Sequence, residues 1–195
     1  MDPMLRRILL LSLLSAHGLT APWQISAEPP DLSKEIEGLS RELEREAGDT
    51  PYIVIDRVSN RFQIRRRGNL ILEAVCATGS GRILYGPKGK LWSFETPKRV
   101  FSIQRKVIDP VWAKPEWAFV ETGEKHPVLP WAFRRLDVTT LGDYALELGD
   151  GFEIHGTLYP NLLGRHITHG CIRLNDEDLE AAYSSTEEGL PVYVY

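Results

Sequence analysis

The feature that most constrains the fold is a series of short β-type segments between residues 51 and 195, separated by turns rich in glycine and proline. Residues 52–58 and 61–65 flank Ser59 and Asn60, which predicts a β-hairpin with a two-residue turn. The further strands that we expect are residues 70–77, 100–104, 144–148, 152–154 and 192–195. Many short strands separated by such turns are typical of an all-β sandwich or barrel.

Two helical segments are expected beside the strands. Residues 31–46 carry an apolar stripe with helical spacing, formed by Leu32, Ile36, Leu39 and Leu43. A second helix is expected to begin after Asn175, which would cap it, with the acidic residues 176–178 in its first turn. We therefore expect a mainly β chain with one or two short helices, preceded by an N-terminal helix.

The N-terminus has the pattern of a secretory signal peptide. Arg6 and Arg7 precede a short apolar run at residues 8–16, and small residues follow at the spacing that a signal peptidase recognises. An uncleaved membrane anchor is the alternative, but this run is shorter than the roughly 20 residues that span a bilayer. We therefore expect residues 1–18 to be removed and the protein to be exported to the periplasm or cell envelope.

The remaining chain is expected to consist of a linker with the amphipathic helix, at residues 19–50, and one folded domain, at residues 51–195. The formal net charge is −4. Removal of residues 1–18 takes away two arginines and one aspartate, which leaves −5. A mildly acidic domain has no electrostatic attraction to nucleic acid or anionic lipid. We expect neither a nucleic-acid partner nor stable membrane insertion, and the oligomeric state stays open.

Chemically reactive residues are concentrated near the C-terminus. Three of the five histidines (His155, His166 and His169) and one of the two cysteines, Cys171, lie within 17 residues. A thiol near imidazoles can become a thiolate nucleophile. Gly170 has no side chain, so its backbone N–H can approach a reacting carbonyl closely.

These residues also carry a family resemblance. The stretch HGTLYPNLLGRHITHGCIRL, residues 155–174, resembles the signature of the YkuD-type L,D-transpeptidases, which are enzymes that cross-link the bacterial cell wall. Residues 77–79 and 95–103 resemble two further pieces of that family, although Arg99 stands where the family usually has glycine. The resemblance covers roughly residues 51–195 and implies an L,D-transpeptidase-like β-sandwich as the catalytic domain.

The resemblance implies a role for each residue of the motif. Cys171 would attack a peptidoglycan stem tetrapeptide, release its terminal D-amino acid and form a thioester that an amine then accepts. Spacing alone suggests His169 as the base, whereas the resemblance assigns the base to His155, and we follow the resemblance. His169 then supports the site, the Gly156 carbonyl orients the base, and the N–H groups of Gly170 and Cys171 are oxyanion-hole candidates.

Substrate-binding candidates are Arg173, Thr168, Trp112 and Trp117. Arg173 can pair with a substrate carboxylate, or alternatively form a structural ion pair with residues 176–178. The two tryptophans lie in a proline-containing segment that the resemblance places near the cleft. They can form a lid or platform for the stem peptide, or simply pin a loop to the core.

Three alternatives concern the reactive residues. His155, His166, His169 and Cys171 could in principle bind zinc, but no metal-binding spacing supports this, so we expect no metal and no cofactor. His166 is otherwise expected to be a surface histidine. Cys76 is expected to be a buried, inert thiol, although pairing with Cys171 in an oxidising compartment would lock the site.

Several functions stay open, and most of them begin with the same acylation of Cys171. Peptidoglycan stem peptides are the expected partner. Water as acceptor would give an L,D-carboxypeptidase, a free D-amino acid would give exchange, and a lysine of an envelope protein would give protein anchoring. A non-catalytic wall-binding module and an ordinary cysteine peptidase are the alternatives from other classes.

Overall fold

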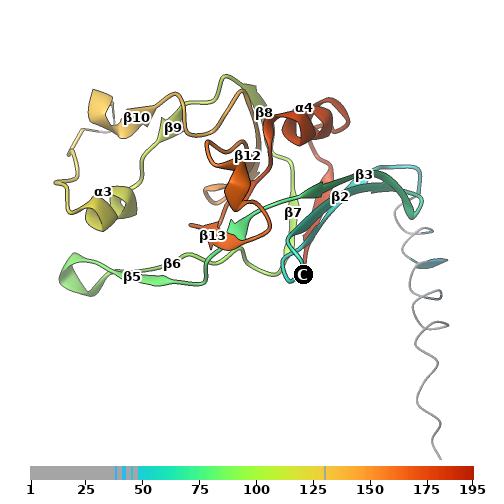
Figure 1. The fold of residues 1–195 in the computed structure, drawn as a ribbon, viewed down its shortest axis with the longest axis horizontal. Coiled ribbons are helices and arrows are strands. Elements are labelled where there is room, and N and C mark those ends of the chain that lie inside the picture. The colour runs from blue at the N-terminus through green and yellow to red at the C-terminus, as the bar shows by residue number, and fades with distance from the viewer. Residues whose placement is uncertain (1–37, 39–40, 43–44, 46–47, 130) are drawn as a thin grey trace, which may run out of the picture. The chain divides into compact units, whose positions relative to one another are not determined.

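The computed structural model describes residues 38, 41–42, 45, 48–129 and 131–195. This part of the chain is mostly β with two α-helices, so the predicted fold class is confirmed (Figure 1). The strands form two principal sheets and three two-stranded pairs.

The first sheet has five strands in the order β3-β2-β1-β15-β7. Its strands are antiparallel except for the β1–β15 pair, which brings the start and the end of the domain together. The bounds are β1 Tyr52–Asp56, β2 Arg61–Arg66, β3 Asn69–Val75, β7 Val100–Ser102 and β15 Pro191–Val194.

The β1–β2 connection differs from the predicted two-residue turn. Asp56 pairs with Arg61 in the ladder, so four residues connect the strands. The Asp56 carboxylate accepts hydrogen bonds from the backbone N–H groups of Val58 and Ser59, and Asn60 adopts a positive φ of 53°. An aspartate that satisfies these N–H groups stabilises the longer turn.

The second sheet has four strands in the order β14-β12-β11-β8 and holds the reactive motif. Their bounds are β8 Arg105–Ile108, β11 Tyr144–Gly149, β12 Phe152–His155 and β14 Ile172–Arg173. The smaller pairs are β4 Thr78–Gly79 with β13 His166–Thr168, β5 Ile83–Tyr85 with β6 Leu91–Ser93, and β9 Trp112–Ala113 with β10 Leu136–Asp137. Short 3₁₀ turns lie at Pro87–Gly89, Phe133–Arg135 and Pro160–Leu162.

One hydrophobic cluster joins the two sheets and helix α4, Asp176–Ser184. It contains Ile53 and Phe62 from the first sheet, Ile154 from the second, and Leu179 from the helix. Such alternating inward-facing residues are what holds the layers of a sandwich together. The expected N-cap is confirmed, because the side chain of Asn175 accepts a hydrogen bond from the N–H of Asp178 at 2.8 Å.

Cys76 is completely buried in this cluster, as predicted. Burial raises the pKa of its thiol to about 12. Both Cys76 and Cys171 are free thiols in the structure.

Helix α3, Glu116–Thr122, was not expected, because the proline- and tryptophan-containing segment before it has the composition of a loop. The helix begins after Pro115, buries Phe119, and ends at Gly123, whose backbone is left-handed. In Figure 1, α3 lies close to β9 and β10, at the opposite end of the domain from β2 and β3.

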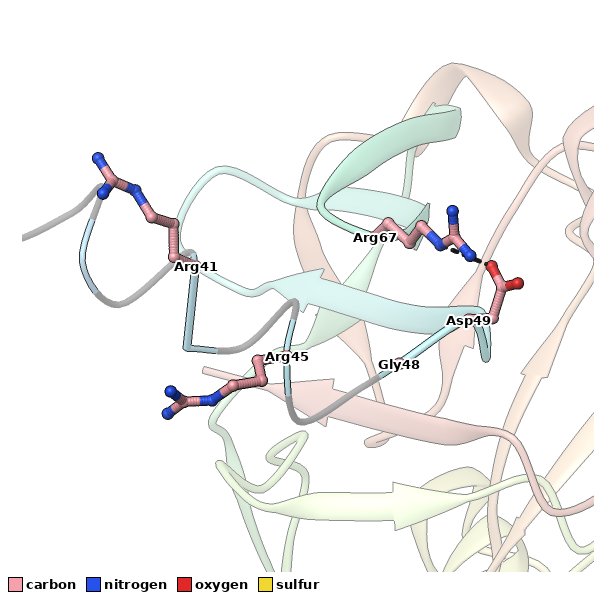
Figure 2. A pocket seen from close by; sticks show the side chains of 5 residues that line it. All are labelled: Arg41, Arg45, Gly48, Asp49 and Arg67. Atoms are coloured by element: carbon pink, nitrogen blue, oxygen red, sulfur yellow. Dashed lines mark ion pairs between the residues drawn. The ribbon is translucent and has the colours of Figure 1, made fainter.

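The expected signal peptide and most of the expected helix at residues 31–46 lie outside the described residues. Arg41 and Arg45 are exposed and line a surface pocket together with Gly48, Asp49 and Arg67 (Figure 2). Arg67 and Asp49 form an ion pair of 2.8 Å in this pocket. No helix in the described ranges is both long and apolar enough to cross a bilayer.

Candidate active site

Strand pairing brings the two principal motif residues to one face of the second sheet. Strands β12 and β14 are parallel, with Ile154 opposite Ile172 and His155 opposite Arg173. Because Ile154 and Ile172 face the core, His155, Arg173 and the residue before Ile172, Cys171, lie on the other face. Cys171 is partly exposed, whereas His155 is only 3% exposed.

The His155 ring is buried in its neutral form. Burial, and next the nearby positive charge of Arg173, lower the pKa of His155 to about 3. The backbone of Gly156 acts in the opposite direction and raises the pKa of His155. The buried Nδ1 of His155 nevertheless has no hydrogen-bond partner that meets the usual geometry. Gly156 is closely packed, because a Cβ there would lie 3.0 Å from the Leu141 carbonyl oxygen and 3.2 Å from the Gly142 Cα.

The thiol of Cys171 is also neutral at rest. Burial raises the pKa of Cys171 to about 12, and the negative charge of Glu153 adds to the rise. Glu153 is two residues before His155 on β12 and therefore lies on the same sheet face. The Cys171 Sγ contacts the Gly151 carbonyl oxygen at 3.7 Å. At rest, both the Cys171 thiol and the His155 imidazole are therefore neutral.

Two buried threonine hydroxyls hold the backbone around the thiol. Thr168 Oγ1 donates to the Cys171 carbonyl at 2.6 Å and accepts from the Gly170 N–H at 3.1 Å. Thr96 Oγ1 donates to the Gly170 carbonyl at 2.7 Å and accepts from the Gly79 N–H at 2.8 Å. The Gly170 N–H and the Thr168 hydroxyl thus form hydrogen bonds within this loop, and their expected oxyanion-hole and substrate-binding roles stay predictions. The Cys171 N–H keeps its oxyanion-hole candidacy.

Gly170 adopts a φ of +128°, a conformation that L side chains rarely adopt. A Cβ at this position would also lie 3.0 Å from the Phe152 ring and 3.2 Å from the Glu95 carbonyl oxygen. Only glycine fits between His169 and Cys171.

The His169 ring is held from three sides and points toward helix α3. It stacks on Trp117, with ring centroids 4.2 Å apart and planes 20° apart, and Phe94 meets it edge-on at 4.5 Å. Its Nε2 lies 2.7 Å from the carboxylate of Glu121. Nε2 is therefore engaged by Glu121, and the supporting role of His169 stays a prediction.

The remaining substrate-binding candidates lie near this ring or near His155. Trp112 and Trp117 border a cavity of about 200 Å³ together with His169. Arg173 is half-buried beside His155, and the alternative ion pair with residues 176–178 does not form in the described structure.

His166 is exposed, as expected, but it is not without partners. Its Nδ1 lies 3.0 Å from Thr78 Oγ1, and its Nε2 lies 3.3 Å from Asn60 Nδ2. Within the described ranges, no three His, Cys, Asp or Glu side chains are gathered so that they could hold a metal ion.

Known proteins share this sequence motif and fold. Residues 50–194 match the family model of the YkuD L,D-transpeptidase catalytic domain. The chain belongs to this family. It is 29% identical over 101 residues to the probable L,D-transpeptidase ErfK/SrfK of Salmonella typhimurium, and 29% identical over 90 residues to the probable L,D-transpeptidase YbiS of Escherichia coli. These alignments cover 51% and 46% of this chain but only 33% and 29% of the relatives, so the match spans about a third of their length.

Solved structures share the fold at lower identity. An L,D-transpeptidase from Mycobacterium smegmatis matches with a TM-score of 0.52 and 20% identity, over 74% of this chain and 58% of the other. The catalytic domain of the Enterococcus faecium L,D-transpeptidase matches with a TM-score of 0.52 and 18% identity, over 75% of this chain and 98% of the other.

Sequence reasoning about this L,D-transpeptidase domain missed the side chains that hold the motif. Thr96 lies in the 95–103 segment that resembles the family, and the sequence assigns no role to Phe94 or Glu121. Nothing in their spacing indicates a contact with residues 168–171, which lie more than 45 positions away. Arg99, at the usual glycine position of the family, has no positive φ and pairs with Asp150 at 2.7 Å, so the turn does not require glycine.

Proposed function

We propose that this chain is an exported peptidoglycan L,D-transpeptidase in which Cys171 is the nucleophile and His155 is the base. The observation that carries the proposal is the β12–β14 pairing, which supports placing a partly exposed thiol and a buried neutral imidazole on one sheet face. A neutral imidazole can accept a proton, as a general base must. Residues 1–18 are proposed as the signal peptide, residues 19–50 as the linker with its helix, and residues 51–195 as the catalytic domain.

Acylation of the enzyme is the first half of the proposed reaction. The Cys171 Sγ attacks the carbonyl carbon between the third and fourth residues of a donor stem while His155 takes the thiol proton. The resulting oxyanion is stabilised by the backbone N–H of Cys171. The intermediate then collapses, the carbon–nitrogen bond breaks, and His155 returns its proton to the departing amine of the terminal D-amino acid.

Transfer of the acyl group is the second half. The amine of an acceptor attacks the thioester carbonyl and loses a proton to His155. The carbon–sulfur bond breaks, the thiol of Cys171 recovers the proton, and a new amide bond joins the two stems. Because both groups are neutral at rest, each proton moves together with the attack, rather than before it.

The proposal is tested by analysing products with mass spectrometry. Protein that begins at residue 19, with its thiols reduced, is incubated with disaccharide-tetrapeptide muropeptides, beside the Cys171→Ala variant. We expect a Cys171-dependent dimer that is lighter than two tetrapeptides by one D-alanine. A tripeptide monomer alone would move the assignment to L,D-carboxypeptidase, and the absence of any Cys171-dependent product would contradict the catalytic proposal for this substrate.

The acceptor and the inhibitor response can be tested on the same protein. Added free D-amino acid or an envelope-protein lysine peptide would yield exchanged or anchored products if it replaces the second stem. A carbapenem should acylate Cys171, because it presents a strained carbonyl to the thiol. Intact mass that shows no adduct on reduced protein would count against the family mechanism.

A further inference from the structure

We propose that Glu121 and Trp117 of helix α3 are positioning residues for acyl transfer, which act by fixing the imidazole of His169 and, through it, the backbone of Gly170 and Cys171. This inference rests on the proposed function, because the backbone matters only if Cys171 is acylated. It assigns to α3 a part in the chemistry itself, in addition to any contact with substrate.

Both residues reach His169 from one face of the helix. Trp117 and Glu121 are four positions apart, so their side chains lie one above the other on α3. Trp117 stacks on the imidazole at 4.2 Å, and the Glu121 carboxylate accepts a hydrogen bond from Nε2 at 2.7 Å. Trp117 therefore fixes the plane of the His169 imidazole, and Glu121 fixes the direction in which its Nε2 points.

The contact is partly shielded from water. The side chains of His169 and Glu121 are 29% and 31% exposed. An interaction at this depth is screened less than a surface ion pair. Glu124, two residues beyond the end of α3, provides the contrast, because it pairs with Arg134 at 2.8 Å while both side chains are half exposed or more.

Helix α3 is itself fixed, so it can hold the ring in place. The Trp117 ring packs against the rings of Phe94 and Trp112, with ring centroids 5.3 Å and 5.9 Å away. Both neighbours lie outside helix α3. Glu116, at the start of the helix, pairs with Lys90, and Phe119 is buried. Aromatic contacts of this kind contribute energy beyond the area that they bury.

The imidazole of His169 lies next in sequence to the backbone of Gly170 and Cys171. His169 precedes Gly170, whose φ of +128° is unusual, so contacts on either side of Gly170 help to keep this conformation. The hydroxyls of Thr96 and Thr168 hold the Gly170 and Cys171 carbonyls on one side of this turn, and α3 holds His169 on the other. The direction of the Cys171 N–H depends on the peptide between Gly170 and Cys171. An oxyanion-hole donor must lie within about 2.7–3.1 Å of the developing charge, so a loosened His169 weakens acylation.

A positioning role and a merely structural role predict different kinetics. Alkylation by iodoacetamide requires only an accessible thiol that can ionise, whereas acylation by a carbapenem also requires an aligned oxyanion-hole donor. Loss of positioning should therefore slow acylation selectively. Loss of folded protein would slow acylation but speed alkylation, because unfolding exposes both thiols. A change in the Cys171 thiol itself would move both rates in the same direction.

The experiment compares both rates in four variants of the protein that begins at residue 19. We expect Glu121→Ala to slow carbapenem acylation by about 10- to 100-fold, as small misplacements do, with alkylation within about twofold of the wild type. Glu121→Gln should restore acylation, because its amide oxygen still accepts from Nε2. Trp117→Leu, which keeps apolar volume but removes the stacked ring, should show the same selective loss. Glu73→Ala, which removes an exposed carboxylate of strand β3 outside the cavity that Trp117 and His169 border, should match the wild type in both reactions.

Each outcome decides the matter. Wild-type acylation in Glu121→Ala and Trp117→Leu, or a parallel fall of acylation and alkylation, would overturn the positioning role. If Glu121→Ala does not fold, the Trp117→Leu result stands in its place. A wild-type protein that is alkylated but never acylated, and that makes no muropeptide product, would instead refute the proposed function.

Discussion

The hydroxyl of Thr96 offers the sharpest test of how the reactive turn is held. Thr96 is 1% exposed, and its hydroxyl links the Gly79 N–H to the Gly170 carbonyl. The substitution Thr96→Val keeps the branched shape and removes both hydrogen bonds at once. Water cannot readily replace the lost partners in a site this buried, so two backbone polar groups are left unsatisfied.

The cost follows from those two groups. Each buried group left without a partner costs about 1–3 kcal/mol, so the free energy of unfolding should fall by about 2–6 kcal/mol. That is a large share of the roughly 5–15 kcal/mol that keeps a domain folded. Thr96→Ser, the matched control, keeps the hydroxyl and loses one methyl group, for about 0.5–1.5 kcal/mol.

The assay is urea unfolding of the three proteins, followed by carbapenem acylation of those that are folded. We expect the Val variant to unfold at lower urea with an unchanged slope, and to acylate more slowly than the Ser variant because the Gly170 carbonyl is released. A Val variant within about 0.5 kcal/mol of the wild type, or a Ser variant as unstable as the Val variant, would refute the reasoning.

Three further predictions concern the thiol and helix α4. Because the pKa of Cys171 is raised to about 12, native alkylation should keep accelerating from about pH 7 to about pH 10, with Cys76 unmodified until the protein unfolds; a plateau near pH 8 would contradict this. Glu153→Gln removes a negative charge that raises the pKa of Cys171, so alkylation at a fixed pH should become severalfold faster, and an unchanged rate would exclude the charge as a cause. Asn175→Ala removes the cap of the Asp178 N–H and should cost about 1 kcal/mol in urea unfolding, whereas Asn175→Ser should cost much less.

Local signals in the sequence were sufficient for most strands and for helix α4. The predicted strand at residues 144–148 is Tyr144–Gly149 in the structure, and the predicted cap at Asn175 is formed. Alternating side chains and capping residues act over a few positions, so they can be recognised without knowledge of the rest of the fold. The β1–β2 turn was missed because the Asp56 side chain, rather than the turn dipeptide, determines its length.

The sequence contains residues typical of both ends of helix α3, but the composition of the segment before it favours a loop. Pro115 precedes its first residue and Gly123 ends it with a left-handed backbone, the usual asymmetry of helix ends. The tryptophans and prolines at residues 108–117 nevertheless indicate a loop. Its contact with His169 was beyond sequence reasoning, since Glu121 is 48 positions from its partner and only the folded domain brings them together.

The neutral resting state gives the contacts at residues 168–171 a role in the proposed mechanism. A preformed thiolate beside a charged imidazole would supply a strong nucleophile whatever the surrounding backbone did. In this domain burial lowers the pKa of His155 and raises that of Cys171, so both groups resist the charges that attack creates. The barrier must then be lowered mainly at the oxyanion, where backbone donors act only if they are already aligned. In the proposed mechanism, the hydroxyls of Thr96 and Thr168 and the contacts of Trp117 and Glu121 with His169 supply that alignment. Substitutions there should therefore reduce acylation, even though none of these residues exchanges a proton with substrate.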